Sequence, residues 1–387
     1  MSLTAYLIGA GLTKSLEIPG YPVPLMTNFI PVMTKYIGND VVLNTLVQME
    51  LGHVYESSCQ ECEECAQILG GSVPDSTPEQ RAHFAGLVSS RPPEPIETLL
   101  ARASSLARVN TYASGSEQLV KYAINQVFSI IGWNLQLAIL AKFLRRQFED
   151  AAGDHVFISF NYDLVLDRSI AHASEGRWQP TDGYGFTLPY YTTEDTSSSS
   201  PSGSAGAFST QELPFGSPRI RILKPHGSLN WLLRRSNAAD GQSRAGDPER
   251  MVLVLDNDCG LRYWPSTHTF NYISGADTWP RDFAIHIVAP TPDKPPIMQQ
   301  VLSNEEEALK KAEEMFVIGY SLPKTDRDQQ SLIKKVVSQR ERRSAIKRLT
   351  VVNYGEQPSY FEMLSDLFKA TSIRKFNDGF EAFVAQT

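Results

Sequence analysis

Short apolar runs recur along the chain, and each ends abruptly in small or polar residues. Their length and their β-branched and aromatic side chains are typical of buried strands. They are AYLIG (5–9), VFISF (156–160), RIRIL (219–223), MVLVL (251–255), AIHIV (284–288), MFVIG (315–319), LTVVN (349–353) and SIRKF (372–376). Helical or irregular segments separate them, and strands alternating with helices indicate a parallel sheet with crossovers. The pattern predicts an α/β protein with a Rossmann-like parallel sheet.

The pattern changes to a helical period between the first two runs. From about Asp40 to Ala152, apolar residues recur on more than one face, as in helices packed between other helices. We therefore expect a single domain, residues 1–387, with a helical layer inserted at about 25–152.

One segment has the composition of a flexible loop. Residues 193–210 are rich in Ser and Gly and offer little apolar surface to bury. Such a loop is either a lid over a site or a tolerated surface insertion, and we favour the insertion.

Composition and charge narrow the class of protein. The net charge of -7 favours neither nucleic acid nor an anionic membrane surface. The start MSLTAYLIGAG lacks the features of a signal peptide, and no apolar run approaches the roughly 18 residues of a membrane span. We expect a cytoplasmic protein.

Three of the four cysteines are crowded into the segment CQECEEC. Cys59, Cys62 and Cys65 have a spacing that suits zinc, with His53 as the nearest fourth ligand. The same residues fit one side of a helix from Val41 to about Leu69, where small cysteines pack well. We favour the helix and expect no metal.

Glycines follow the first predicted strand. Gly9 and Gly11 are suited to a phosphate cradle, because glycine lets backbone N–H groups approach a pyrophosphate. The dinucleotide fingerprint is incomplete, since Lys14 stands in place of its third glycine.

Polar residues follow the later strands as well. Asn161 and Asp163 either cap the next helix or belong to a ligand site at the strand ends. His226 follows a strand beside an expected flexible pair, Gly227 and Ser228, where a sheet presents reactive groups.

Two further strand ends have similar residues. Gly319, Tyr320 and Ser321 follow one strand, and Asn353 follows another. Asp326 is expected to cap the helix that comes next. Together, these strand ends predict a nucleotide cleft.

The motifs resemble those of a known family. GAG (9–11), SFNYD (159–163), KPHGS (224–228), VIGYSLP (317–323) and VVN (351–353) occur in the order found in the sirtuin superfamily. The chain is more similar still to the sirtuin-like NAD-consuming proteins of bacterial anti-phage defence. Unlike sirtuin deacylases, it lacks Asp-Phe-Arg after Ile18 and Pro19. It also lacks a paired CxxC module between Asn161 and His226.

The resemblance implies roles for these residues. Asn161 and His226 are implied to be catalytic, with Asn161 beside the nicotinamide ribose. The implied cofactor-binding residues are Gly9, Ala10, Gly11, Thr13, Asp163, Gly227, Ser228, Gly319, Tyr320, Ser321 and Asn353.

The implied activity is hydrolysis of NAD+ to nicotinamide and ADP-ribose, with NAD as the substrate and His226 as the base. The resemblance also implies an abortive-infection effector that forms a homo-oligomer. A separate ATPase, Argonaute-like protein or phage component would activate it, because only a short segment follows Asn353. An NAD-dependent protein deacylase and a catalytically silent NAD or ADP-ribose binding subunit stay open as alternatives.

A basic segment near the C-terminus has two interpretations. Residues 334–348 form a docking face for a partner or the solvated side of a helix, and we favour the solvated side.

Overall fold

The computed structural model describes most of the chain apart from residues 38–94 and several shorter segments. The described residues are 2–25, 28–37, 95–109, 114–132, 134–149, 153–180, 183–186, 190–192, 208–209, 219–234, 251–255, 283–288, 294, 296–323, 326–340, 346–355 and 357–387. They fall into two compact units. The first comprises Met1–Val23 with Ile131–Thr387, and the second Pro24–Ile130.

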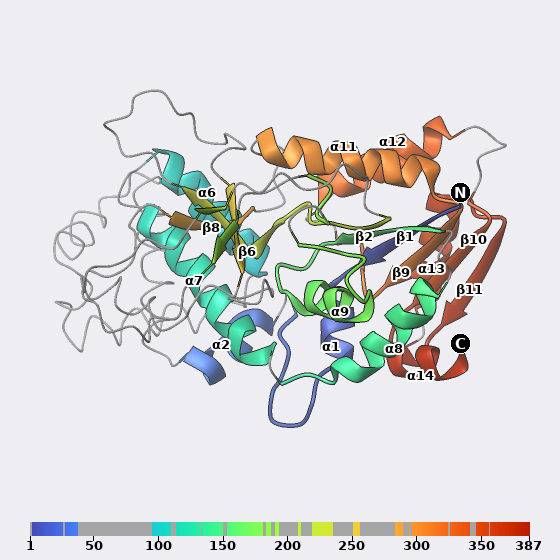
Figure 1. The fold of residues 1–387 in the computed structure, drawn as a ribbon, viewed down its shortest axis with the longest axis horizontal. Coiled ribbons are helices and arrows are strands. Elements are labelled where there is room, and N and C mark those ends of the chain that lie inside the picture. The colour runs from blue at the N-terminus through green and yellow to red at the C-terminus, as the bar shows by residue number, and fades with distance from the viewer. Residues whose placement is uncertain are drawn as a thin grey trace. The chain divides into compact units, whose positions relative to one another are not determined.

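A parallel sheet forms the centre of the first unit (Figure 1). Its strands are β1 (Leu3–Ile8), β2 (Asp154–Ser159), β5 (Ile220–Leu223), β9 (Glu314–Ile318), β10 (Arg348–Val352) and β11 (Ser372–Phe376). The order across the sheet is β5-β2-β1-β9-β10-β11, and every described pairing is parallel. In chain order this is third, second, first, fourth, fifth, sixth, the Rossmann arrangement of two half-sheets. The predicted α/β fold class is confirmed.

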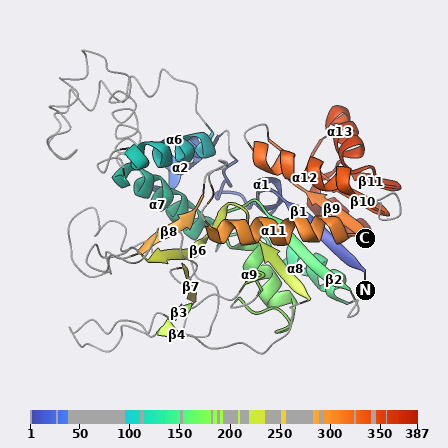
Figure 2. The same cartoon turned by 90° about the horizontal axis from the view of Figure 1, so that it is seen from above.

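Helices cover both faces of this sheet (Figures 1 and 2). On one face lie α11 (Pro296–Lys311) and α12 (Arg327–Gln339), with α13 (Pro358–Phe368) packed against α12. The helices of the other face are α1 (Ala10–Ser15), α8 (Leu137–Phe148), α9 (Val165–Ala173) and α14 (Gly379–Gln386). The sheet is therefore doubly wound.

An aromatic row across three strands anchors the core. Tyr6 of β1 is in register with Phe157 of β2 and Phe316 of β9. Its ring stacks on both, with centroids 4.2 Å and 5.0 Å apart. Phe143 of α8 meets the same ring edge-on at 6.2 Å. Period-2 alternation brings these side chains to one face, where burial of large rings stabilises the layer.

The same unit contains a second, mixed sheet. Its strands are β3 (Tyr190–Thr192), β4 (Phe208–Ser209), β6 (Gly227–Arg234), β7 (Met251–Leu255) and β8 (Phe283–Ile287), in the order β4-β3-β7-β6-β8. Predicted strands 251–255 and 284–288 therefore do not join the parallel sheet, because both pair antiparallel with β6.

Strand β6 corrects a second expectation. Gly227 and Ser228 were expected to be flexible, yet they begin this buried strand, and Ser228 is fully buried. Gly227 pairs with Ile287 of β8, and the later part of the strand, Trp231–Leu233, pairs with β7, so strand pairing outweighs the turn preference of Gly and Ser. Within the predicted loop 193–210, Phe208 and Ser209 form β4, whereas 193–207 and 210 lie outside the described residues.

The second unit is helical in its described part. It contains α2 (Phe29–Ile37), α6 (Ile96–Val109) and α7 (Ser114–Ile131), and Phe29 packs against Phe128 with ring centroids 6.0 Å apart. This unit spans Pro24–Ile130, and the following helix α8 packs with α9 and α14 of the first unit. The expected bounds of the helical layer, about 25–152, stay a prediction.

The choice between a zinc site and a helix for the cysteine-rich segment concerns residues outside the described part of the chain. Cys59, Cys62, Cys65, His53 and the helix expected around them fall in residues 38–94, which are not described. Elsewhere, among described residues, no three metal-ligating side chains gather into a site. Of the described helices, none has the length and apolarity needed to cross a membrane.

A tight backbone junction joins β1 to β9. Gly319 has φ +59°, the left-handed region that favours glycine. A Cβ at Gly319 would lie 2.3 Å from the amide nitrogen of Leu12, and one at Gly9 would lie 2.5 Å from the carbonyl oxygen of Gly319. The amides of Gly9 and Gly11 donate to the carbonyls of Ile318 (3.1 Å) and Gly319 (2.9 Å). These glycines allow the two strand ends to touch.

We predict that Gly319→Ala destabilises the fold by about 3 kcal/mol or more, because it adds backbone strain to a clash with main-chain atoms. Gly355→Ala is the matched control, since Gly355 has φ +79° but nothing within 4 Å of an added Cβ. It should cost only about 1–2 kcal/mol. Equilibrium unfolding in urea measures both, and equal losses would contradict the importance of close packing at Gly319.

Candidate functional site

Glycines and polar residues follow the strand ends at the carboxyl edge of the parallel sheet. Gly9, Asn161, Lys224, Gly319 and Asn353 follow the ends of β1, β2, β5, β9 and β10. The chain order reverses between β1 and β9. In doubly wound sheets, ligands bind outside the strand ends at such a reversal.

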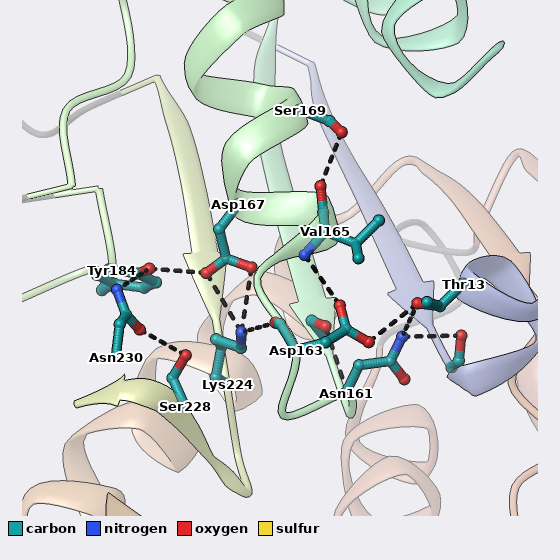
Figure 3. Close-up of polar contacts among 12 residues, drawn as sticks. Thr13, Asn161, Asp163, Val165, Asp167, Ser169, Tyr184, Lys224, Ser228 and Asn230 are labelled. Carbon is teal, nitrogen blue, oxygen red and sulfur yellow. Dashed lines mark hydrogen bonds and ion pairs between the residues drawn. The ribbon is translucent and has the colours of Figure 1, made fainter. Parts of the chain in front are cut away.

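Asn161 is held by hydrogen bonds from its amide group (Figure 3). Its Nδ2 donates to the Gly9 carbonyl (3.2 Å) and to Thr13 Oγ1 (3.1 Å). Both amide hydrogens are thereby used, whereas Oδ1 accepts no hydrogen bond from any described residue. The side chain thus presents a fixed carbonyl oxygen, an acceptor for a hydroxyl group or a water molecule.

Asp163 completes this arrangement. Its Oδ2 accepts from the Thr13 hydroxyl (3.0 Å), and its Oδ1 accepts from the backbone N–H of Val165 (3.0 Å) at the start of α9. Burial raises the pKa of Asp163, opposed by Lys224 and by these two hydrogen bonds, and Asp167 raises it further. Both carboxylate oxygens are used within the protein, so Asp163 supports the helix start and, through Thr13, the orientation of Asn161.

A buried lysine lies behind Asp163 (Figure 3). Lys224 Nζ donates to the Asp163 carbonyl (2.6 Å) and pairs with Asp167 at 3.1 Å, and both side chains of this ion pair are fully buried. Tyr184 donates to the same carboxylate of Asp167 (2.7 Å). The ends of β2 and β5 are therefore joined through α9.

The same network includes the start of β6. Ser228 donates to Asn230 Oδ1 (2.7 Å), and Asn230 donates to the Tyr184 hydroxyl (3.3 Å). Burial raises the pKa of Tyr184 well above its usual value, and the Asp167 carboxylate raises it further. Since the Ser228 hydroxyl is committed to Asn230, the geometry gives this residue a structural part.

His226 makes a side-chain contact that the sequence did not reveal. Its Nε2 lies 3.1 Å from Asp326 Oδ2, and the Tyr320 hydroxyl donates to that oxygen at 3.0 Å. Asp326 stands at the N-cap position of α12, but its side chain caps none of the described backbone amides. The expectation of a capping role is therefore wrong. Burial alone would raise the pKa of Asp326, but His226, Lys294 and Tyr320 together lower it.

The His226 ring lies beside the two residues that flank Asn161 in sequence. Phe160 and Tyr162 flank Asn161 in sequence, and their ring centroids lie 5.8 Å and 6.4 Å from that of His226. Phe160 also stacks on Tyr320, with centroids 3.9 Å apart. The segments that follow β2, β5 and β9 thus meet through the rings of Phe160, Tyr162, His226 and Tyr320.

The predicted phosphate cradle has a different geometry from the one expected. The amides of Gly9 and Gly11 donate to the carbonyls of Ile318 and Gly319, so they are not available to a pyrophosphate. The glycines are explained by the close approach of β9. The neighbouring Ala10 is half-buried at the start of α1.

Other predicted residues lie along the same edge without joining this cluster. Asn353 is half-buried and donates to Gln357 Oε1 (3.3 Å), whereas Ser321 is exposed. Among described residues, neither makes a hydrogen bond to Asn161 or His226. The neighbouring Tyr354 is 82% exposed.

Sequence reasoning missed the roles of Asp326, Asp167 and Lys224. Asp326 is 100 residues from His226, and Asp167 is 57 residues from Lys224, so no local spacing reveals either contact. One signal was available in the sequence: a lysine or an aspartate next to an apolar strand or helix. Because such charges are rarely buried without a partner, each one indicates an oppositely charged or hydrogen-bonding partner elsewhere in the chain.

Comparisons with known proteins give only weak similarities. No protein-family model matches the chain, and no curated protein does either. Solved structures that resemble it include one described as "Structural Basis for the Mechanism and Regulation of Sir2 Enzymes", which is 14% identical, covers 64% of this chain and 67% of its own, and has a TM-score of 0.30.

Two others are similar over nearly the whole length. A mutant Sir2 with a p53 peptide and NAD is 13% identical, with 99% of this chain and 91% of that chain covered and a TM-score of 0.36. A mutant Sir2 homologue in complex with ADP-ribose is 10% identical, with 99% and 89% covered and a TM-score of 0.38. Similarities this weak carry no conclusion about function, and the fold class follows from the chain's own strand order.

We predict that Lys224→Met destabilises the protein by about 3–5 kcal/mol, because it leaves the Asp167 carboxylate buried without its cation. The matched control is Lys335→Met, since Lys335 pairs with Glu306 on the surface with its own side chain 54% exposed. That change should have little effect. Urea unfolding at neutral pH compares them, and similar midpoints for the two variants would contradict the prediction.

Proposed function

We propose that this protein is a sirtuin-like NAD+ glycohydrolase that cleaves NAD+ to nicotinamide and ADP-ribose. The observation that carries the proposal is that Asn161 and His226 both lie beyond strand ends at the carboxyl edge of a Rossmann sheet, and that the His226 ring lies beside Phe160 and Tyr162, which flank Asn161. Asn161 offers a fixed acceptor oxygen, and His226 has a ring nitrogen, Nδ1, with no partner among described residues. The order of the sequence motifs supports the same family.

The chemistry suits these two side chains. The bond between nicotinamide and ribose breaks with its electron pair moving to the nicotinamide nitrogen, so a cationic ring leaves as a neutral molecule. A water oxygen forms the new bond to the ribose carbon, and His226 takes the proton that this water loses. Asn161 Oδ1 accepts a hydrogen bond from that water or from a ribose hydroxyl, and so orients it.

We favour hydrolysis over deacylation because the chain lacks the paired CxxC module of the deacylases. A deacylase needs a peptide groove for an acylated lysine, and the family's deacylases carry a paired CxxC module beside theirs. No cysteine occurs between Asn161 and His226 in this chain. Without an acyl group to intercept the sugar cation, water is the acceptor.

The biological setting follows from the sequence resemblance alone. We propose that depletion of NAD+ serves an anti-phage, abortive-infection response. A partner protein or self-assembly would then switch the activity on, since uncontrolled loss of NAD+ harms the cell that makes the enzyme.

The first experiment is a time course of NAD+ loss and nicotinamide release by the purified protein, with and without an acetylated peptide. His226→Ala and Asn161→Ala should lower the rate by about 10²–10⁴-fold, as expected for removal of a general base or its orienting partner. His172→Ala is the matched control, because His172 is exposed on α9 and contacts Arg145.

Three outcomes separate the candidate functions. Nicotinamide release without peptide, lost in His226→Ala, supports the hydrolase. Release that requires the peptide identifies a deacylase. If the purified protein binds nucleotide by calorimetry, and no turnover occurs even after extract of phage-challenged cells is added, the protein is a binding subunit. That result contradicts the proposal.

A second prediction concerns Thr13, whose hydroxyl links Asn161 to Asp163. Thr13→Val keeps the shape but removes the hydroxyl, so the amide of Asn161 loses one of its two acceptors and its orientation loosens. We expect kcat to fall at least about tenfold, whereas Thr13→Ser should stay close to wild type. Steady-state kinetics measure this, and a wild-type kcat in Thr13→Val would show that the hydroxyl does not position Asn161.

A further inference from the structure

Asp326 occupies a position where an aspartate normally serves its own helix. It precedes α12, yet its carboxylate turns away from the first turn and caps none of the described amides. Instead, Oδ2 meets both His226 Nε2 (3.1 Å) and the Tyr320 hydroxyl (3.0 Å). His226 and Asp326 are each only 2% exposed. An aspartate at this position normally stabilises its helix by accepting hydrogen bonds from the first backbone amides. Because the Asp326 carboxylate contacts His226 instead, we connect its role with that histidine.

The contact determines which ring nitrogen carries hydrogen. A carboxylate accepts hydrogen bonds, so Nε2 beside Asp326 Oδ2 must be the protonated nitrogen of the neutral ring. The lone pair is then on Nδ1. This atom is buried and has no hydrogen-bond partner among described residues. An unpartnered lone pair on a ring nitrogen is the acceptor that a general base requires.

We propose that Asp326 is a positioning residue that holds the His226 ring with hydrogen on Nε2, so that Nδ1 is the atom that removes the proton. The effect of Asp326 on catalysis rests on the proposed hydrolase function. Which nitrogen of the His226 ring carries hydrogen can be measured whether or not the protein turns over NAD+. When Nδ1 takes a proton, the ring becomes a cation, and the carboxylate 3.1 Å from Nε2 stabilises it.

The surroundings keep Asp326 in place. Tyr320 donates to Oδ2 and is itself stacked on Phe160, so the accepting oxygen has a fixed direction. Lys294 Nζ donates to the carbonyl of Pro225 (3.2 Å), the residue before His226, and its charge also favours the ionised form of Asp326. The start of α12 adds the positive end of a helix dipole.

Other titratable groups face the same region. Glu305 of α11 is fully buried and receives a hydrogen bond from Gln329 (3.2 Å), and burial raises its pKa, opposed by Lys294. Asp328 acts on Lys294 from the first turn of α12. Among described residues, none of these groups contacts the His226 ring, so Asp326 is the carboxylate that acts on it directly.

The decisive experiment reads the state of the ring directly. Long-range ¹H–¹⁵N spectra of histidine-labelled protein distinguish the two neutral forms, and His226→Ala identifies the signals of this residue. Wild type should show hydrogen on Nε2. Asp326→Ala should shift His226 to a mixture or to hydrogen on Nδ1, whereas Asp328→Ala, which removes the same charge two residues away, should leave the wild-type pattern.

Kinetics provide the second measurement. Asp326→Ala should lower kcat for NAD+ cleavage by about 10²–10³-fold with KM within a few-fold, since the substrate still binds. Asp326→Asn offers an amide oxygen to Nε2 without the charge, so the ring should keep its hydrogen on Nε2 while kcat falls roughly tenfold. This variant also serves if Asp326→Ala fails to fold.

The outcomes separate this proposal from the hydrolase function. Hydrogen on Nδ1 in wild type, or an unchanged His226 spectrum in folded Asp326→Ala, overturns the positioning role even if NAD+ is hydrolysed. Hydrogen on Nε2 that depends on Asp326, in a protein that does not cleave NAD+ even in extracts of phage-challenged cells, supports the positioning role and overturns the hydrolase.

Discussion

A single buried hydroxyl group, that of Thr13, joins the two strand ends on which the candidate site depends. It accepts a hydrogen bond from Asn161 and donates one to Asp163, so the turn after β1 fixes the tip of β2. A hydroxyl can donate and accept through a single oxygen atom, which an ionised carboxylate cannot. The direction of each bond is thereby set, and the one polar atom of Asn161 left without a partner among described residues is its carbonyl oxygen.

The part of the site that contains Tyr320, Asp326 and His226 depends on a steric constraint rather than on a hydrogen bond. Where β1 meets β9, the absence of side chains at Gly9 and Gly319 lets two backbones touch. This contact fixes the backbone position of Tyr320, the next residue after Gly319. The Tyr320 hydroxyl in turn donates to the Asp326 carboxylate, which contacts His226. Close packing on one side and a hydrogen-bond chain on the other thus hold Asn161 and His226 from different strands.

The sequence predicted the parallel sheet well because its strands are buried on both faces and therefore appear as apolar runs. Asn161 and His226 do lie beyond strand ends at the edge where parallel strands end together, and their catalytic role stays a prediction. Strand β6 was missed because Ser228 and Asn230 resemble turn residues; only the fold shows that they take part in one buried network. The partner of His226 was missed because Asp326 has a sufficient local explanation as a cap, and a contact across 100 residues leaves no periodic signal.

The place of β1 in the sheet also affects how the protein is made. Thr4 is paired with His155 on one side and with Glu314 on the other. At about 5–20 residues per second of synthesis, β9 follows β1 from the ribosome by roughly 15–60 s. During that interval the innermost strand has an open edge, and Gly319, Tyr320 and Asp326 do not yet exist. A chain that stops short of β9 therefore cannot assemble the contact between His226 and Asp326, so the candidate site forms only after Asp326 has been synthesised.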